Sequence, residues 1–252
     1  KRQSYYQGIK HKQKKAYEAD IIIEEVLRYR KDQKRLGTRK LFGQMKTFIA
    51  QHGFQIGRDA MFELLSERGL LVRKRKRSAC VTTYSKHRFK KYPNIIRDFI
   101  PTAPNQLWVS DITYIHLKNE FAYLSLVTDA YSRKIVGFHL SKDLSAKGPL
   151  KALQMALKAN PNNSGLIHHS DRGVQYCCDA YVKLLTDGKI KISMTEKGDP
   201  LENAIAERVN GILKTELLEE EFSDFNTACM AIAKACSTYN HLRPHGSIND
   251  LK

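Results

Sequence analysis

Three carboxylates in the second half of the chain have a spacing that suits chemistry on a phosphate group. Asp171 comes two residues after the strand-like run Leu166–His169, and strand ends are where α/β sheets build their sites. Asp111 lies within Leu107–Ile115, a run rich in β-branched and aromatic residues. A charge on the otherwise apolar face of such a strand must be paired or hold a metal. Glu207 lies in a run with helical spacing, and we expect folding to gather all three carboxylates in one oxygen-lined pocket.

Polar neighbours of these carboxylates are candidates for supporting roles. Asn203 is four residues before Glu207, so the two share a helix face, whereas Glu202 does not. Alternation along a strand sends one of His168 and His169 toward the site and the other into the core.

Carboxylates in this number suit a hard divalent cation. Mg²⁺ and Mn²⁺ take oxygen ligands, and two such ions can clamp an in-line displacement at phosphorus without a protein nucleophile. We therefore expect Asp111, Asp171 and Glu207 to be both the catalytic and the metal-binding residues. The alternative for Asp111 taken alone is an acid at a frayed strand end, or one paired with an arginine elsewhere in the chain.

Four motifs carry a family resemblance. They are Trp108–Tyr114, His168–Tyr176, Asn203–Glu207 with Leu213–Glu216, and Tyr239–His245. In this order, and with 35 residues between Asp171 and Glu207, the chain resembles the DDE transposases and integrases of the retroviral-integrase superfamily. It is most similar to the second-frame (OrfB) product of two-frame bacterial insertion sequences.

One position departs from the family pattern. The family usually carries Asp where this chain has Glu202. Because that position lies off the Glu207 face, we expect little consequence from the change.

The resemblance implies an RNase H-like fold and a metal-dependent transposase. Family members nick the ends of their element with water and then join the freed 3′-OH to another strand, often through a circular intermediate. DNA ends and target DNA would be the partners, and joining two ends implies at least a dimer. Two alternatives remain: an RNase H-like, structure-specific nuclease that cuts without joining, and a non-catalytic DNA-binding regulator derived from a transposase.

The charge of the chain is distributed unevenly. The net charge is +17, and residues 1–104 account for all of it, since acidic and basic residues balance over 105–252. This asymmetry indicates that the first part holds a phosphate backbone while the second does chemistry on it. A basic surface that serves only solubility is the alternative.

Helical patterns fill the first part of the chain. An opening segment finishes a helix before residue 17, a second helix ends near Arg30, and Thr38 caps a third that ends at Gly53. Arg58 begins the next helix, which is the candidate reader of a DNA groove. We predict a small all-α, helix-turn-helix domain at 1–72 and a basic linker at 73–104 that lies along DNA.

The remainder, 105–252, is predicted to be an α/β, RNase H-like catalytic core, a mixed five-stranded sheet with flanking helices. Strands are expected at 107–117, 121–130 and 134–141, in a run ending at 171, and at 190–194. Helices are expected at 146–159, 175–186, 202–208 and 226–239.

Basic side chains are the candidate DNA contacts. They are Arg58, Arg73, Lys74, Arg75, Lys76, Arg77, Lys86, Arg88, Lys90, Lys91, Arg172, Lys214 and Arg243.

Composition places the chain among proteins of the cytoplasm. No run approaches the length of a membrane span, and no signal peptide precedes the first residues. The five cysteines form no C-x-x-C pair, so we interpret them as reduced thiols. The first residue is not Met, and we expect the chain to belong to a longer protein.

Overall fold

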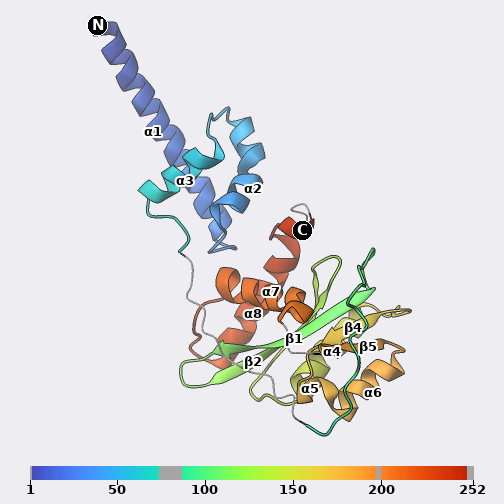
Figure 1. The fold of residues 1–252 in the computed structure, drawn as a ribbon. Helices are drawn as coiled ribbons and strands as arrows, with labels where there is room; N and C mark the ends of the chain where they lie inside the picture. The colour runs from blue at the N-terminus through green and yellow to red at the C-terminus, as the bar shows by residue number, and fades with distance from the viewer. Residues whose placement is uncertain (1, 74–86, 197–199, 249–252) are drawn as a thin grey trace. The chain divides into compact units, whose positions relative to one another are not determined.

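A computed structural model describes residues 2–73, 87–196 and 200–248 of the chain (Figure 1). The chain divides into two compact units, Lys1–Lys76 and Arg77–Lys252. We call the first the helical unit and the second the sheet unit. Each is described separately below.

The helical unit contains α1 (Arg2–Arg30), α2 (Thr38–Gln51) and α3 (Arg58–Glu67). The prediction of two helices before residue 31 is wrong, because α1 runs through both without a break. Thr38 is not a cap either: Gly37 is the N-cap of α2 and no side chain bonds there.

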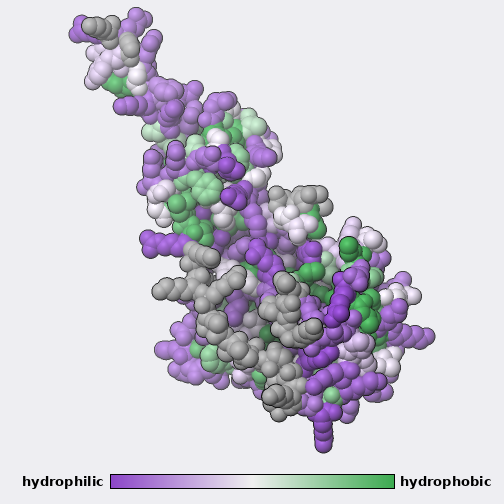
Figure 2. Space-filling view, in the orientation of Figure 1, coloured by the Kyte–Doolittle hydropathy of each residue, from purple (hydrophilic) through white to green (hydrophobic). Residues whose placement is uncertain are grey.

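An apolar cluster holds the three helices together. Its buried members come from the second half of α1, the α1–α2 connection, α2 and α3: Ile22, Val26, Leu36, Leu41, Met45, Ile49, Met61 and Leu65. The described side chains of the first half of α1 are exposed, and Figure 2 shows a mainly hydrophilic surface along that half. Tertiary packing therefore stabilises only the second half of this helix.

The sheet unit is built on five strands in the order β3-β2-β1-β4-β5. β1 (Leu107–His116), β2 (Phe121–Asp129) and β3 (Ile135–Ser141) are antiparallel neighbours, while β4 (Ile167–Ser170) and β5 (Lys191–Met194) run parallel to β1. Three antiparallel strands followed by two parallel ones is the mixed arrangement of an RNase H-like fold, as predicted.

Helices cover both faces of this sheet. α4 (Lys147–Ala159), α5 (Val174–Cys177) and α6 (Asp179–Asp187) pack on one face around Trp108. The other face carries α7 (Ala204–Ile212), the π-helical turn η2 (Leu213–Leu217) and α8 (Phe225–His241). The single helix expected over 175–186 is two helices, since Cys178 has an extended backbone.

One glycine shows how tightly α4 lies on the sheet. A Cβ on Gly137 of β3 would stand 2.1 Å from the carbonyl oxygen of Ala152 in α4. Only a residue without a side chain fits there.

The predicted linker is partly wrong, because residues 87–104 pack on the sheet unit. Phe89 and Tyr92 join the core cluster around Trp108, and the backbone N–H of Ile95 donates to Ser193 Oγ at 3.1 Å. We call residues 87–97 the strap. Its aromatic side chains anchor it to the sheet unit, so the strap is part of that unit.

Within the described residues, no helix is long and apolar enough to cross a membrane.

Candidate active site

Neighbouring parallel strands bring the first two carboxylates together. In the pairing of β1 with β4, Val109 stands opposite His169, and continuing this register by two residues places Asp111 beside Asp171. Parallel neighbours lie about 4.8 Å apart. Both side chains line one small pocket, together with Gln175 and other residues.

The electrostatics of Asp111 show that all three predicted carboxylates share one neighbourhood. Burial, then the charge of Asp171 and, more weakly, that of Glu207 raise the pKa of Asp111 to about 7. Two hydrogen bonds act in the opposite direction: the Ile112 N–H donates to Oδ1 at 2.9 Å, and Asn210 Nδ2 donates to Oδ2 at 2.7 Å. Burial is the dominant effect and the negative charge of Asp171 adds to it, so the pocket disfavours the charged form of Asp111.

Glu207 lies at the edge of this arrangement. It sits in the first turns of α7, its side chain is exposed, and it is not among the residues that line the pocket. Partial loss of solvent raises the pKa of its carboxyl group. Across the described ranges, no group of three or more His, Cys, Asp and Glu side chains is close enough to hold a metal ion. The structure therefore places two carboxylates in the pocket and the third nearby.

Two asparagines tie α7 to the strand that carries Asp111. Asn203 Nδ2 donates to the carbonyl oxygen of Ser110 at 3.0 Å, at the start of α7. Asn210, near its end, binds the Asp111 carboxylate itself. Asn203 is buried and its amide binds β1, and its supporting role beside Glu207 stays a prediction.

Sequence analysis missed Asn210. It lies three residues after Glu207 and so on the same side of the helix, which is the signal that could have identified it.

Both histidines before Asp171 are fully buried. His168 Nε2 lies 2.8 Å from Ser110 Oγ and 3.0 Å from the Tyr181 hydroxyl, within the core of the α6 face. His169 Nδ1 lies 2.8 Å from Ser193 Oγ. Burial lowers the pKa of His168 to about 3 and that of His169 to about 4. Both rings are therefore neutral at pH 7, and this geometry favours a structural role for each.

No activated thiol accompanies the carboxylates among the described cysteines. Burial raises the pKa of Cys177 to about 11, and its Sγ contacts Met194 Sδ at 3.6 Å. A neutral, buried thiol is a poor nucleophile.

Two of the predicted phosphate contacts lie near the pocket. Arg172 Nη1 donates to the carbonyl oxygen of Glu196 at 3.0 Å, and Lys214 Nζ donates to Thr113 Oγ1 at 3.2 Å. Both side chains are partly buried, and their contact with DNA stays a prediction.

Arg243 does not fit the role that sequence analysis gave it. Its side chain is 2% exposed and pairs with Glu216, whose two carboxylate oxygens accept from Nε at 2.8 Å and from Nη2 at 2.9 Å. A guanidinium held in this way is not available to a phosphate, so the prediction of a DNA contact is corrected. Asn240 also has a structural role, since its amide exchanges two 2.9 Å hydrogen bonds with the backbone of Ile135.

The surroundings of Arg58 weigh against α3 as a reader of DNA. Arg58 Nε is 2.8 Å from Asp59 Oδ1, and the helix also exposes Glu63 and Glu67. A DNA contact at Arg58 stays a prediction, although these acids would repel phosphate.

The other predicted basic contacts fall in two groups. Arg88, Lys90 and Lys91 of the strap are exposed, as is Arg73. Lys74, Arg75, Lys76, Arg77 and Lys86 lie outside the described residues.

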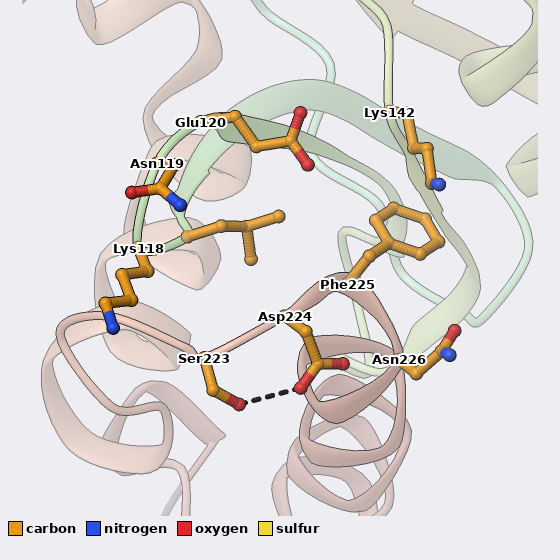
Figure 3. Close-up of a pocket in the computed structure, with 9 residues that line it drawn as sticks. Lys118, Asn119, Glu120, Lys142, Ser223, Asp224, Phe225 and Asn226 are labelled. Atoms are coloured by element: carbon orange, nitrogen blue, oxygen red, sulfur yellow. Dashed lines mark hydrogen bonds between the residues drawn. The ribbon is translucent and has the colours of Figure 1, made fainter.

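A more open hollow lies away from the carboxylates, between the β1–β2 turn and the start of α8 (Figure 3). Lys118 and Lys142 are on its rim, and Asp224 lies at its base. The Asp224 carboxylate caps α8 by accepting from the Thr227 N–H at 2.9 Å. The polar groups of this hollow therefore have a structural function, and none of the predicted site residues lies there.

Comparison with known proteins identifies the family. Two models described as integrase core domain match residues 101–200 and 188–252. The uncharacterized 31 kDa protein of insertion element IS600 from Shigella sonnei is 33% identical over 99% of this chain and 92% of its own length. The chain belongs to the bacterial insertion-sequence transposases of the DDE superfamily.

A second insertion-sequence relative agrees with this assignment. A putative transposase for insertion sequence element IS986/IS6110 from Mycobacterium tuberculosis is 30% identical over 84% of this chain and 79% of its own length. Among solved structures, the catalytic core domain of HTLV-2 integrase, determined in complex with magnesium, has a TM-score of 0.46 and 22% identity, covering 59% of this chain and 94% of that one.

Proposed function

We propose that this transposase nicks DNA at the ends of an insertion sequence and joins the freed strand to another DNA, with Asp111, Asp171 and Glu207 as the catalytic residues. The observation that carries the proposal is that Asp111 of β1 and Asp171 at the end of the neighbouring parallel strand β4 line one small pocket, in a chain that belongs to this family.

The two carboxylates in the pocket fit a divalent cation, Mg²⁺ or Mn²⁺. Their oxygens are hard ligands that line one pocket, and burial together with the charge of Asp171 raises the pKa of Asp111. Asp111 and Asp171 would hold the cation, and Glu207 from α7 would complete the oxygen set. One or two such cations, when bound there, would supply activation of the attacking hydroxyl or water and stabilisation of the leaving oxygen at phosphorus.

The chain's own residues position these ligands. Asn210 donates to Asp111 Oδ2, and the Ile112 N–H donates to the other oxygen of the same carboxylate, Oδ1. The Gly173 N–H donates to Asp171 Oδ1 at 2.9 Å. These bonds fix both carboxylates, and the two bonds to Asp111 favour its charged form. This activity requires DNA as the partner, and at least two copies of the chain would bind it as a homo-oligomer.

The test is a strand-joining assay with a labelled terminal inverted repeat and Mg²⁺. Wild-type protein should yield both cut and joined strands. Asp111→Asn, Asp171→Asn and Glu207→Gln should each lower both products by roughly a thousandfold or more, while binding to the end is retained. Glu221→Gln removes an exposed acid outside the pocket and should act like the wild type.

The products of this assay distinguish the transposase from the two alternative functions. Cut strands without joined strands would indicate a nuclease, and end binding without either product would indicate a regulator. Full joining by any of the three amide variants would contradict the assignment of that carboxylate.

A further inference from the structure

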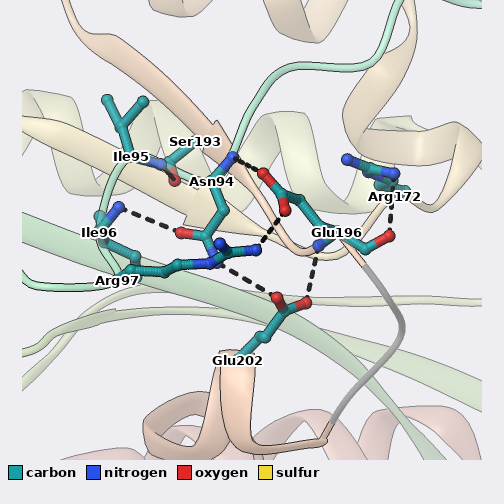
Figure 4. Close-up of polar contacts among 8 residues, drawn as sticks. All are labelled: Asn94, Ile95, Ile96, Arg97, Arg172, Ser193, Glu196 and Glu202. Atoms are coloured by element: carbon teal, nitrogen blue, oxygen red, sulfur yellow. Dashed lines mark hydrogen bonds and ion pairs between the residues drawn. The ribbon is translucent and has the colours of Figure 1, made fainter.

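Two carboxylates outside the pocket join the ends of the segment between β5 and α7 (Figure 4). Glu196 follows β5 by two residues, and Glu202 lies in the 3-10 turn η1 (Pro200–Asn203) that leads into α7. The N–H of Glu196 donates to Glu202 Oε2 at 2.7 Å. Glu202 is therefore bonded in place five residues before Glu207. The expectation that this departure from the family pattern has little consequence stays a prediction.

The strap binds both of these carboxylates. The backbone N–H of Asn94 donates to Glu196 Oε1 at 3.2 Å, and the side-chain amide of the same residue donates to Glu202 Oε1 at 3.4 Å. Arg97 forms an ion pair with Glu196. Cationic and amide donors thus compensate two acids that would otherwise repel each other.

The same group of contacts reaches the turn that carries Asp171. Arg172 Nη1 donates to the carbonyl oxygen of Glu196 at 3.0 Å, and the backbone oxygen of Arg172 accepts from His87 Nε2 of the strap at 2.9 Å. The residue directly after Asp171 is therefore connected to the segment that leads to Glu207.

We propose that Asn94, Arg97, Arg172, Glu196 and Glu202 form a positioning cluster that holds the start of α7, and with it Glu207, at a fixed place beside the Asp171 turn. The inference rests on the proposed function, because Glu207 is assigned as a catalytic residue there. Glu202 acts through the backbone and does not touch the reacting atoms.

The chemistry of Glu202 makes the proposal specific. Its two oxygens accept from two different donors. In Glu202→Gln one of these oxygens becomes an NH₂ group that faces a donor, so one of the two bonds is lost. Glu202→Asp keeps both oxygens on a side chain one methylene shorter, so it should retain part of the function.

The first test follows hydrogen exchange in the full, metal-free chain. Glu202→Gln should speed exchange of the α7 amides and of those in α5 after Asp171 by about tenfold, while α8 and the helical unit exchange as in the wild type. Glu221→Gln is the matched control and should leave all these segments unchanged. Unchanged exchange in α7, or an equal increase throughout the sheet unit, would overturn the proposal.

The second test measures how joining depends on Mn²⁺ concentration. In Glu202→Gln the displacement of Glu207 should raise the Mn²⁺ concentration needed for half-maximal joining by about tenfold. The joining rate at saturating Mn²⁺ should be nearly unchanged, and Glu202→Asp should recover part of the wild-type midpoint. A variant that only lost folded protein would lower the rate at saturation without shifting the midpoint, and that result would contradict a positioning role.

A second variant guards against a general loss of folding. Asn94→Ala removes the bond to Glu202 Oε1 and the bond that the Ile96 N–H donates to Asn94 Oδ1 within the strap. In a double mutant with Glu202→Gln its effect on α7 exchange should be less than additive. Fully additive effects would overturn the proposal. If wild-type protein failed to join DNA, the proposed function would fail, while the exchange data would still test the cluster.

Discussion

The helical unit and the sheet unit both have apolar cores but differ in the polar contacts that accompany them. In the helical unit an apolar cluster joins the helices, both α2 and α3 begin at glycines without a side-chain cap, and the ion pair Arg68–Asp20 is exposed. In the sheet unit, polar side chains bind across long stretches of sequence, as Asn203 does to Ser110 and Arg243 to Glu216.

This difference indicates that the two units have different roles. Apolar packing tolerates small shifts, whereas buried hydrogen bonds specify one arrangement, because an unpaired buried polar group is costly. The sheet unit therefore has the rigidity that catalysis on phosphate requires, and the helical unit presents exposed basic side chains.

Adding one methyl group in each unit should give the largest contrast. Gly137→Ala would place a Cβ against the Ala152 carbonyl and should cost about 3 kcal/mol. Gly43→Ala, in the middle of α2 where nothing lies within 4 Å, should stabilise the helical unit by about 0.5–1 kcal/mol. Urea denaturation of each variant measures both values. Equal effects in the two units would contradict the contrast.

Loss of the asparagine that binds Asp111 should impair activity more than stability. Asn210→Ala removes the donor to Asp111 Oδ2 and should lower strand joining by about tenfold to a hundredfold. Because that bond lowers the pKa of Asp111, the pH at half-maximal activity should also rise. Lys46→Ala, an exposed change in the helical unit, should leave this pH unchanged. A pH profile that Asn210→Ala does not shift would exclude the role given to Asn210.

The pH dependence of stability provides a third test. The folded protein raises the pKa of Asp111 to about 7 from about 4 in an unfolded chain, so the folded state favours the protonated acid. Stability of the metal-free sheet unit should therefore fall as the pH rises from about 4 to 7. In Asp111→Asn this part of the decrease should disappear, raising the melting temperature at pH 8 by a few degrees. Thermal melts of the wild type and of Asp111→Asn in a chelator at pH 5 and pH 8 measure this difference. If stability depended on pH in the same way in both proteins, the burial of the Asp111 charge would be contradicted.

Helix caps should give the smallest effects. Gly57→Ser adds a capping hydroxyl to α3 at an extended backbone with open space around it and should stabilise the helical unit by a few tenths of a kcal/mol.

Asp224→Ala removes the existing cap of α8 and should lower the melting temperature of the sheet unit. Hydrogen bonds from Thr227 lower the pKa of Asp224 to about 2. The contribution of this cap is therefore complete above pH 4 and is lost as the pH falls toward 2. If the melting temperatures of the wild type and Asp224→Ala differed by the same amount at pH 2 and at pH 7, the carboxylate charge would not be involved.

The sequence predicted much of the sheet unit, because its signals are local. Period-two runs located the strands, and the position of Asp171 directly after a strand predicted its place beside Asp111. The resemblance added the mixed sheet order, which periodicity alone does not determine.

Other features could not be predicted, since they depend on contacts between distant residues. No pattern around Asn94 indicates that it binds Glu196 and Glu202, about a hundred residues away, so the strap appeared to be a tether. Likewise, the basic motif at Arg243 did not reveal its buried partner Glu216. The continuous α1 was missed because its first half lacks an apolar face.

The most direct measurement of the central claim, that Asp111 and Asp171 act through a bound divalent cation, is single-turnover joining of a DNA end carrying sulfur in place of a non-bridging oxygen at the scissile phosphate. Sulfur binds Mg²⁺ poorly and Mn²⁺ better. We predict that joining of the sulfur-substituted end is slow in Mg²⁺ and is restored by Mn²⁺ in the wild type, and that Asp171→Asn joins neither end. Equal rates for the oxygen and sulfur ends in Mg²⁺, or joining by Asp171→Asn, would contradict the claim.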